Sequence, residues 1–159
     1  MAGSTTKKAV IRRYEKEPLA GYVNPFSYLQ SGGVELLSAQ GNVSSVPYED
    51  IKTISFVREF ESRQEDRLVF HARPKMEGLW VSFRFRDGEV MEGVMPNNLL
   101  QVEYYGFTVI PPDPNSNNQR IFIPRVSLRS VEVLGVIGGP LKKRKPKPQP
   151  KEQISLFDE

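Results

Sequence analysis

The sequence predicts an all-β protein, and three observations support this prediction. Apolar and polar side chains alternate through residues 81–94 on both sides of Asp87-Gly88, and a period of two gives each strand one buried and one exposed face. An Asp-Gly pair supplies the positive φ angles that a tight hairpin turn needs. Thirteen prolines and twelve glycines indicate frequent turns. We therefore place a β-hairpin at 81–94 and order the other elements around it.

The first half of the chain contains short strand patterns separated by turn residues. Asn24-Pro25 ends one strand, because proline cannot donate a hydrogen bond to the sheet ladder. Ser31-Gly32-Gly33 and Gln40-Gly41-Asn42 predict turns, and Tyr48-Glu49-Asp50 predicts a helical turn. The predicted strands of this half are 9–14, 19–23, 34–37, 43–47 and 51–57.

The second half repeats this pattern. Its predicted strands are 79–86, 89–95, 107–110, 120–123 and 128–134, and residues 100–104 prolong or follow the second of them. Residues 111–118 form a Pro/Asn-rich loop, which we expect to be an ordinary solvent loop rather than a binding site. In the charged connection before the hairpin, Leu68-Val69-Phe70 predicts an extra strand that pairs with 79–85.

The two halves align with each other as an internal repeat. Val46-Pro47 and the apolar positions after it match Ile123-Pro124 and its followers, at an offset of 123 − 46 = 77. Gly21-Tyr22-Val23 matches Gly93-Val94-Met95, at an offset of 93 − 21 = 72. We expect the longer loop at 111–118 to absorb the difference of five. A unit this small buries little surface alone, so the two repeats are expected to pack together.

Five short strands, with a hairpin first and a helical turn before the last, resemble the SH3-like and Sm-like small barrels. The second half is most similar to an Sm motif, with Phe83, Phe85, Gly88 and Gly93 at its strand-glycine-strand opening and 123–131 at the place of the second Sm motif. The resemblance implies two tandem five-stranded small barrels. The predicted organisation is a first barrel repeat at 7–58, a connection at 59–78, a second barrel repeat at 79–137 and a basic tail at 138–159.

The resemblance also implies RNA binding as an alternative function. Sm proteins bind RNA through an Asp…Met-Asn loop after the second strand and an Arg-Gly pair near the fourth. Here the first loop reads Pro96-Asn97-Asn98 and lacks those residues, and the second position reads Pro124-Arg125-Val126 without the glycine. RNA binding is therefore the second of two functional hypotheses.

Composition limits the chemistry that the chain can carry out. With no cysteine, it can form neither a disulfide nor a Cys-ligated zinc site, and the lone His71 cannot form a multi-histidine site. The sequence contains no Gly-x-Ser-x-Gly nucleophile elbow and no Gly-Lys-Ser/Thr phosphate loop. Glu89 and Glu92 lie beside the predicted hairpin and are expected on solvated strand faces. We expect a binding protein with no enzymatic activity, metal or cofactor.

The net charge of +3 is concentrated in the tail. From Gly138 onward there are six basic and three acidic residues, and subtracting these from the totals of 22 and 19 leaves 16 of each in the body. A neutral body is a poor electrostatic footprint for phosphate. Residues 1–8 lack the apolar segment of a secretory signal, and no apolar run approaches membrane-spanning length, so we expect a cytoplasmic protein without a membrane partner.

The tail begins with a basic spacer that alternates lysine with proline through residues 142–151. Proline favours extended polyproline II and like charges repel, so ten such residues form a semi-rigid, disordered spacer of roughly 30 Å. We also expect the basic side chains of this spacer to make a weak contact with nucleic acid. The basic residues of the spacer are Lys142, Lys143, Arg144, Lys145, Lys147 and Lys151.

After the spacer the chain reads Gln153-Ile154-Ser155-Leu156-Phe157. This pentapeptide resembles the bacterial sliding-clamp-binding motif, Gln-Leu-Ser/Asp-Leu-Phe, with Ile154 as the one conservative departure. A Gln amide can donate and accept hydrogen bonds at a pocket mouth, while Leu156 and Phe157 fill an apolar pocket. The resemblance implies the DNA sliding clamp as partner; the alternative is that these apolar residues dock on the protein's own body.

Overall fold

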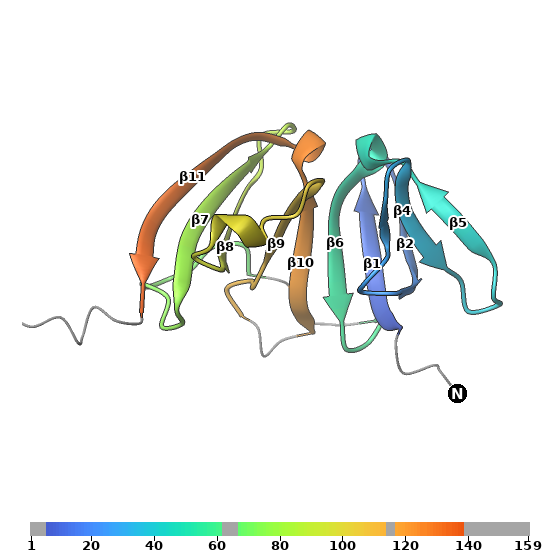
Figure 1. Cartoon of the computed structure of the whole chain (residues 1–159), viewed down its shortest axis with the longest axis horizontal. Helices are drawn as coiled ribbons and strands as arrows, with labels where there is room; N and C mark the ends of the chain where they lie inside the picture. Colours follow the sequence, from blue (N-terminus) through green and yellow to red (C-terminus); the bar gives the residue numbers. More distant parts are fainter. Residues whose placement is uncertain (1–5, 62–66, 114–116, 139–159) are drawn as a thin grey trace, which may run out of the picture.

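The computed structural model describes residues 6–61, 67–113 and 117–138. Over these ranges the protein is all-β, with three short 3-10 helices and no α-helix, which confirms the predicted fold class. The strands form two curled arrays that lie side by side, one from each half of the chain (Figure 1). Among the residues described, no helix is long and apolar enough to cross a membrane.

The first array has the spatial order β6-β1-β2-β4-β5, and the short β3 also pairs with β4. The 3-10 helix η2 (Tyr48–Asp50) precedes the last strand, as the sequence predicts. The array consists of β1 (Lys7–Arg13), β2 (Lys16–Val23), β3 (Leu29–Gln30), β4 (Gly33–Leu37), β5 (Val43–Val46) and β6 (Ile51–Val57).

The second array has the order β11-β7-β8-β9-β10, in which β8 and β9 join through one bridge between Val94 and Ile110. The 3-10 helix η3 (Leu99–Gln101) lies between β8 and β9, and η4 (Arg125–Ser127) precedes the last strand. The array consists of β7 (Gly78–Phe85), β8 (Val90–Met95), β9 (Gly106–Val109), β10 (Asn118–Pro124) and β11 (Leu128–Ile137).

The strand registers show that the two arrays are structural repeats. Ala9 pairs with Gly21 in β1–β2, and Val81 pairs with Gly93 in β7–β8, 72 residues later in both strands. Pro47 and Pro124, 77 residues apart, precede η2 and η4 with the same backbone angles, φ −62° and ψ 143°. The offset is thus 72 in the opening hairpins and 77 from the fourth core strand onward.

Gly33 and Gly106 occupy equivalent places where the third core strand crosses the fourth. A Cβ atom would lie 2.3 Å from the Val46 carbonyl oxygen at Gly33 and 2.2 Å from the Ile123 carbonyl oxygen at Gly106. Both sites therefore require glycine for the same close backbone approach. These glycines are 73 residues apart, so one of the five extra residues enters before β9 and only four enter the loop after it.

Each repeat buries its own apolar cluster, and one fully buried side chain of the second repeat lies in the cluster of the first. Ile11, Ile51 and Ile54 belong to the first cluster, and Phe83 belongs to the second. Phe122, from β10 of the second repeat, is fully buried in the first cluster, where its ring packs edge-on against Tyr28 at 5.9 Å. This inserted ring ties the two repeats into one body.

The loops depart from three of the predictions. Residues 100–104 form no strand, because Asn98 caps η3 instead: its Oδ1 atom accepts from the Leu100 amide at 3.0 Å. Residues 68–70 form no strand along β7, because β8 and β11 already occupy both edges of β7. The hairpin turn has a positive φ only at Gly88, not at Asp87, because its connection is longer than the two-residue type.

Candidate functional site

The seam between the repeats is built from β6 and β10, which pair antiparallel and make one sheet run through both arrays. Phe122 lies opposite Ile54, and Ile121 lies opposite Ser55. β6 and β10 each have a partner strand on both sides. The backbone groups of both strands therefore find hydrogen-bond partners across the seam. The seam is therefore a continuous structural element rather than a hinge between separate domains.

Lys52 on β6 links the repeats electrostatically. Its ammonium lies 2.8 Å from Asp87 Oδ2, contacts the Glu89 carboxylate and sits 5.0 Å from the centre of the Phe85 ring. Burial lowers the pKa of Lys52, but hydrogen bonds to Asp87 and Glu89 outweigh burial and leave that pKa raised. The hydrogen bond from Lys52 lowers the pKa of Asp87. Lys52 and Asp87 are therefore both charged at neutral pH.

A second set of contacts closes the same end of the seam. The Tyr14 hydroxyl lies 2.7 Å from Ser127 Oγ, and the Ser127 hydroxyl donates in turn to the Lys52 carbonyl at 3.0 Å. Arg86 stacks over the Tyr14 ring, with the guanidinium carbon 4.0 Å from the ring centre. Ser127 is fully buried, so this chain of hydrogen bonds fixes η4 against the first repeat.

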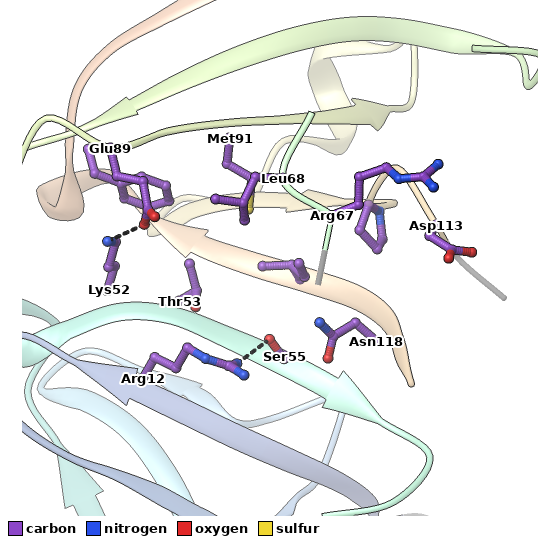
Figure 2. Close-up of a pocket in the computed structure, with 13 residues that line it drawn as sticks. Arg12, Lys52, Thr53, Ser55, Arg67, Leu68, Glu89, Met91, Asp113 and Asn118 are labelled. Carbon is purple, nitrogen blue, oxygen red and sulfur yellow. Dashed lines mark hydrogen bonds and ion pairs between the residues drawn. The ribbon is translucent and has the colours of Figure 1, made fainter. Parts of the chain in front are cut away.

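Beside these contacts the seam holds a small, partly open cavity with polar and apolar walls, lined from both repeats (Figure 2). Arg12 points at Ser55, to which its guanidinium donates at 3.1 Å, and Lys52 points at Glu89. The cavity volume is about 190 Å³, below the roughly 300–1,000 Å³ typical of small-molecule sites. A space of this size with polar groups in its walls suits a few ordered water molecules. We therefore assign it a structural role.

The Pro/Asn-rich loop does not behave as the ordinary solvent loop that the sequence predicts. Pro111, Asp113 and Asn118 line the seam cavity, and Asn118 is buried. Asn117 holds the chain that leaves β6: its Oδ1 accepts from the Glu59 amide at 2.8 Å and its Nδ2 donates to the Glu59 carbonyl at 2.8 Å. The polar composition of the loop thus serves the contact between the repeats.

An aromatic platform, exposed to solvent at Tyr104, lies where η2 and η4 meet. Tyr48 from the first repeat stacks on Tyr105 from the second, with ring centres 4.8 Å apart and an angle of 12°. Tyr104 packs edge-on against Tyr105 at 4.9 Å and leaves 81% of its own surface exposed. Arg125 fixes this arrangement, because its Nε donates to the Tyr104 carbonyl at 2.7 Å. Together with Val126, these residues enclose an open hollow of about 380 Å³.

Arg125 is the one basic side chain among the residues of the platform. Burial, and then the neighbouring Tyr105, raise the pKa of Tyr48 to about 12, so its hydroxyl stays protonated and donates to the Gln30 carbonyl at 2.7 Å. An exposed ring beside a guanidinium can stack a planar group and pair with an anion. The Sm resemblance singles out Arg125, which the structure places in the platform. The contribution of Tyr48 depends on the seam and has no sequence signal.

Other residues singled out in the sequence have simpler roles. Glu92 is half-buried rather than solvated, because its Oε1 accepts from the Trp80 indole and the Phe70 amide, both at 3.1 Å. His71 is exposed. Within the described ranges, no three His, Asp or Glu side chains form a group that could hold a metal ion. The basic spacer and Gln153–Phe157 lie outside the described residues.

These features define a two-repeat all-β scaffold with an aromatic platform at its seam. Residues 5–135 match a family of unknown function (DUF6982), and the chain belongs to this family. The match ends before residues 138–159, so the family describes the body and not the tail. The comparisons found no match among curated proteins or solved structures.

Proposed function

We propose that the protein is a non-catalytic cytoplasmic adaptor whose C-terminal peptide binds the bacterial DNA sliding clamp. The observation that supports this proposal is the run Gln153-Ile154-Ser155-Leu156-Phe157 after a basic, proline-rich spacer. Short apolar motifs at the end of an extended linker commonly bind in a groove of a partner protein. Lysines of the spacer would lie near DNA that passes through the clamp, where they would strengthen the contact.

The folded body holds one end of this spacer. β11 ends at Ile137 on an outer strand of the second repeat, at the opposite end of the molecule from β5 (Figure 1). In this proposal the body binds a second partner while the peptide holds the protein at the clamp.

Titration of a purified bacterial sliding clamp with the full-length protein tests the proposal, with calorimetry as the readout. We expect saturable binding, and the double variant Leu156→Ala/Phe157→Ala to weaken it by at least about 2 kcal/mol, or roughly thirty-fold, as loss of an anchor pair does. The matched control is Leu99→Ala/Leu100→Ala, which removes two exposed apolar side chains from the body. Absence of saturable binding, or equal affinity of the two double variants, refutes the proposal.

A second candidate function is the binding of single-stranded RNA at the aromatic platform. The exposed ring of Tyr104 and the guanidinium of Arg125, held 2.7 Å from the Tyr104 carbonyl, favour this candidate. Stacking of one base on such a ring contributes about 1–3 kcal/mol. Fluorescence anisotropy with a labelled single-stranded RNA, on the full-length protein and on a protein that ends at Ile137, separates the two candidates. RNA affinity that survives truncation and falls with Tyr104→Ala supports the platform.

A further inference from the structure

The seam shows how one repeat receives another. β10 pairs with β6, with Arg120 opposite Phe56 and Phe122 opposite Ile54. In this pairing, the last strand of the first repeat meets the fourth core strand of the second. Two strands hold the same places in their repeats without meeting another repeat: β11 is the last strand of the second repeat, and β5 is the fourth core strand of the first.

These two strands are open edges at opposite ends of the molecule (Figure 1). β11 exposes Val131 by 41% and Val133 by 55%, whereas Ile54, which holds the place of Val131 in β6, is fully buried. β5 exposes Val43 by 63%. An apolar strand edge without a partner is a template for pairing with another chain. The side chains exposed on β11 thus correspond to side chains of β6 that would become exposed if β10 were removed.

The offset of 77 between the repeats gives the register of such a pairing. Subtracting 77 from Arg120 and adding 77 to Phe56 places Val43 opposite Val133. The same operation on Phe122 and Ile54 places Ser45 opposite Val131. The most exposed apolar residue of each edge therefore meets the other, and facing β-branched pairs stabilise antiparallel strands.

The charges at the seam are repeated at the open edges. Lys52 corresponds to Arg129 at the offset of 77, so a cation is kept at the same place on β11. The registers relate the two opening hairpins at an offset of 72 as far as Ile11–Leu19 and Phe83–Met91. Counted along the sequence at this offset, Asp87 and Glu89, which bind Lys52, correspond to Glu15 and Glu17. Arg129, Glu15 and Glu17 are all exposed. Arg129 thus lies on β11 of the second repeat, and both carboxylates lie at the turn between β1 and β2 of the first.

We propose that copies of this chain associate head to tail, with β11 of one copy pairing antiparallel with β5 of the next. Arg129 then binds Glu15 and Glu17 of the neighbouring copy, as Lys52 binds Asp87 and Glu89 within the chain. The contact between copies is weaker than the seam, because Ser45 stands where Phe122 inserts its ring into the first repeat. The association is therefore reversible and depends on protein concentration.

A head-to-tail contact uses two different surfaces and leaves one of each free at the ends of the assembly. Such a heterologous contact produces a ring where its rotation closes and an open chain where it does not. Two other occupants of the β11 edge lead to different outcomes. Pairing of β11 with β11 gives a symmetric dimer that stops at two copies, and the docking of residues 139–159 on their own β11 gives a monomer.

Sedimentation velocity of the full-length protein over a concentration series is the first test. We expect a reversible increase in mass, and Arg129→Glu to shift its midpoint at least about tenfold higher, because like charges then face each other. Glu15→Lys/Glu17→Lys in place of Arg129→Glu has the same effect, and mixing the two variants restores association between them. The control is Arg84→Glu, a charge reversal on β7. A monomer at all concentrations, or an arrest at two copies, overturns the proposal.

Cysteine pairing is the second test, since the natural chain has no cysteine to compete. Val43→Cys and Val133→Cys lie directly opposite each other in the proposed register, within reach of a disulfide. In a glutathione redox buffer, a mixture of the two single variants is expected to give a mixed cross-linked dimer. The control mixture, Val43→Cys with Leu100→Cys, joins sites that do not meet, and Leu100, 95% exposed, is more accessible than Val133 at 55%. A predominant Val133–Val133 product, or equal yields in the two mixtures, overturns the proposal.

Discussion

Replacement of Phe122 by alanine tests whether the two repeats are one cooperative unit. The Phe122 side chain is fully buried, yet it belongs to the apolar cluster of the repeat that does not contain its own strand. Removing the ring takes away about 1.5–3 kcal/mol of transfer free energy. Loss of the edge-on contact with Tyr28 adds about 0.5–1.5 kcal/mol, and the cavity left behind brings the total to about 3–5 kcal/mol.

Urea denaturation followed by two probes measures this effect. Trp80, the single tryptophan, lies on β7 and reports the second repeat, while far-UV circular dichroism reports both. We expect the Phe122→Ala transition to shift to lower urea by the same amount with both probes, since a shared core unfolds as one unit. Phe26→Ala, at a residue 89% exposed, is the control and should leave the midpoint unchanged. A loss below about 1 kcal/mol, or two separate transitions, would show that the seam does not couple the repeats.

Three further changes test the local arguments by denaturation. Lys52→Met leaves two carboxylates facing each other and costs about 1 kcal/mol of unfolding free energy at neutral pH. Folding lowers the pKa of Asp87 and raises that of Lys52. The difference in stability from wild type therefore disappears as the pH falls below about 4 or rises above about 10.4. Gly33→Ala and Gly106→Ala each place a Cβ within 2.3 Å of a carbonyl oxygen and cost about 1–3 kcal/mol, whereas Gly32→Ala, with open space around it, costs less than about 0.5 kcal/mol. Tyr48→Phe leaves the Gln30 carbonyl without its donor and costs about 1–3 kcal/mol of unfolding free energy. The pKa of Tyr48 is about 12, above the ordinary tyrosine value of about 10. The stabilisation from this hydrogen bond is therefore lost as the pH rises from about 10 to about 12.

Local patterns were sufficient to predict most of the fold. The alternation in 51–57 predicts β6 at its observed bounds, and Tyr48-Glu49-Asp50 predicts the 3-10 helix η2 that precedes it. These features depend on neighbours in sequence, where side-chain period and proline geometry act directly. The repeat offsets follow from the same local features, and the registers of the two opening hairpins bear them out.

Features that depend on distant partners could not be predicted in this way. The apolar residues at 68–70 have strand character, but β7 has no free edge to receive them. The pairing of β6 with β10 brings Tyr48 to Tyr105 and Lys52 to Asp87, and neither pair shares a sequence signal. The platform is therefore a product of the seam: a single repeat carries only part of it.

The response of RNA binding to salt separates the platform from the tail, because the two regions contribute different numbers of cations. For single-stranded nucleic acid, the logarithm of affinity falls with the logarithm of salt concentration at a slope of about −0.7 per neutralised phosphate. Arg125 is the cation of the platform, so binding there has a slope near −0.7 and is held mainly by stacking on Tyr104. Engagement of all six basic residues of the spacer gives a slope near −4. Anisotropy titrations over a salt series, on the full-length protein and on the protein that ends at Ile137, measure both slopes. A steep slope that persists after truncation would contradict the assignment of the excess charge to the tail.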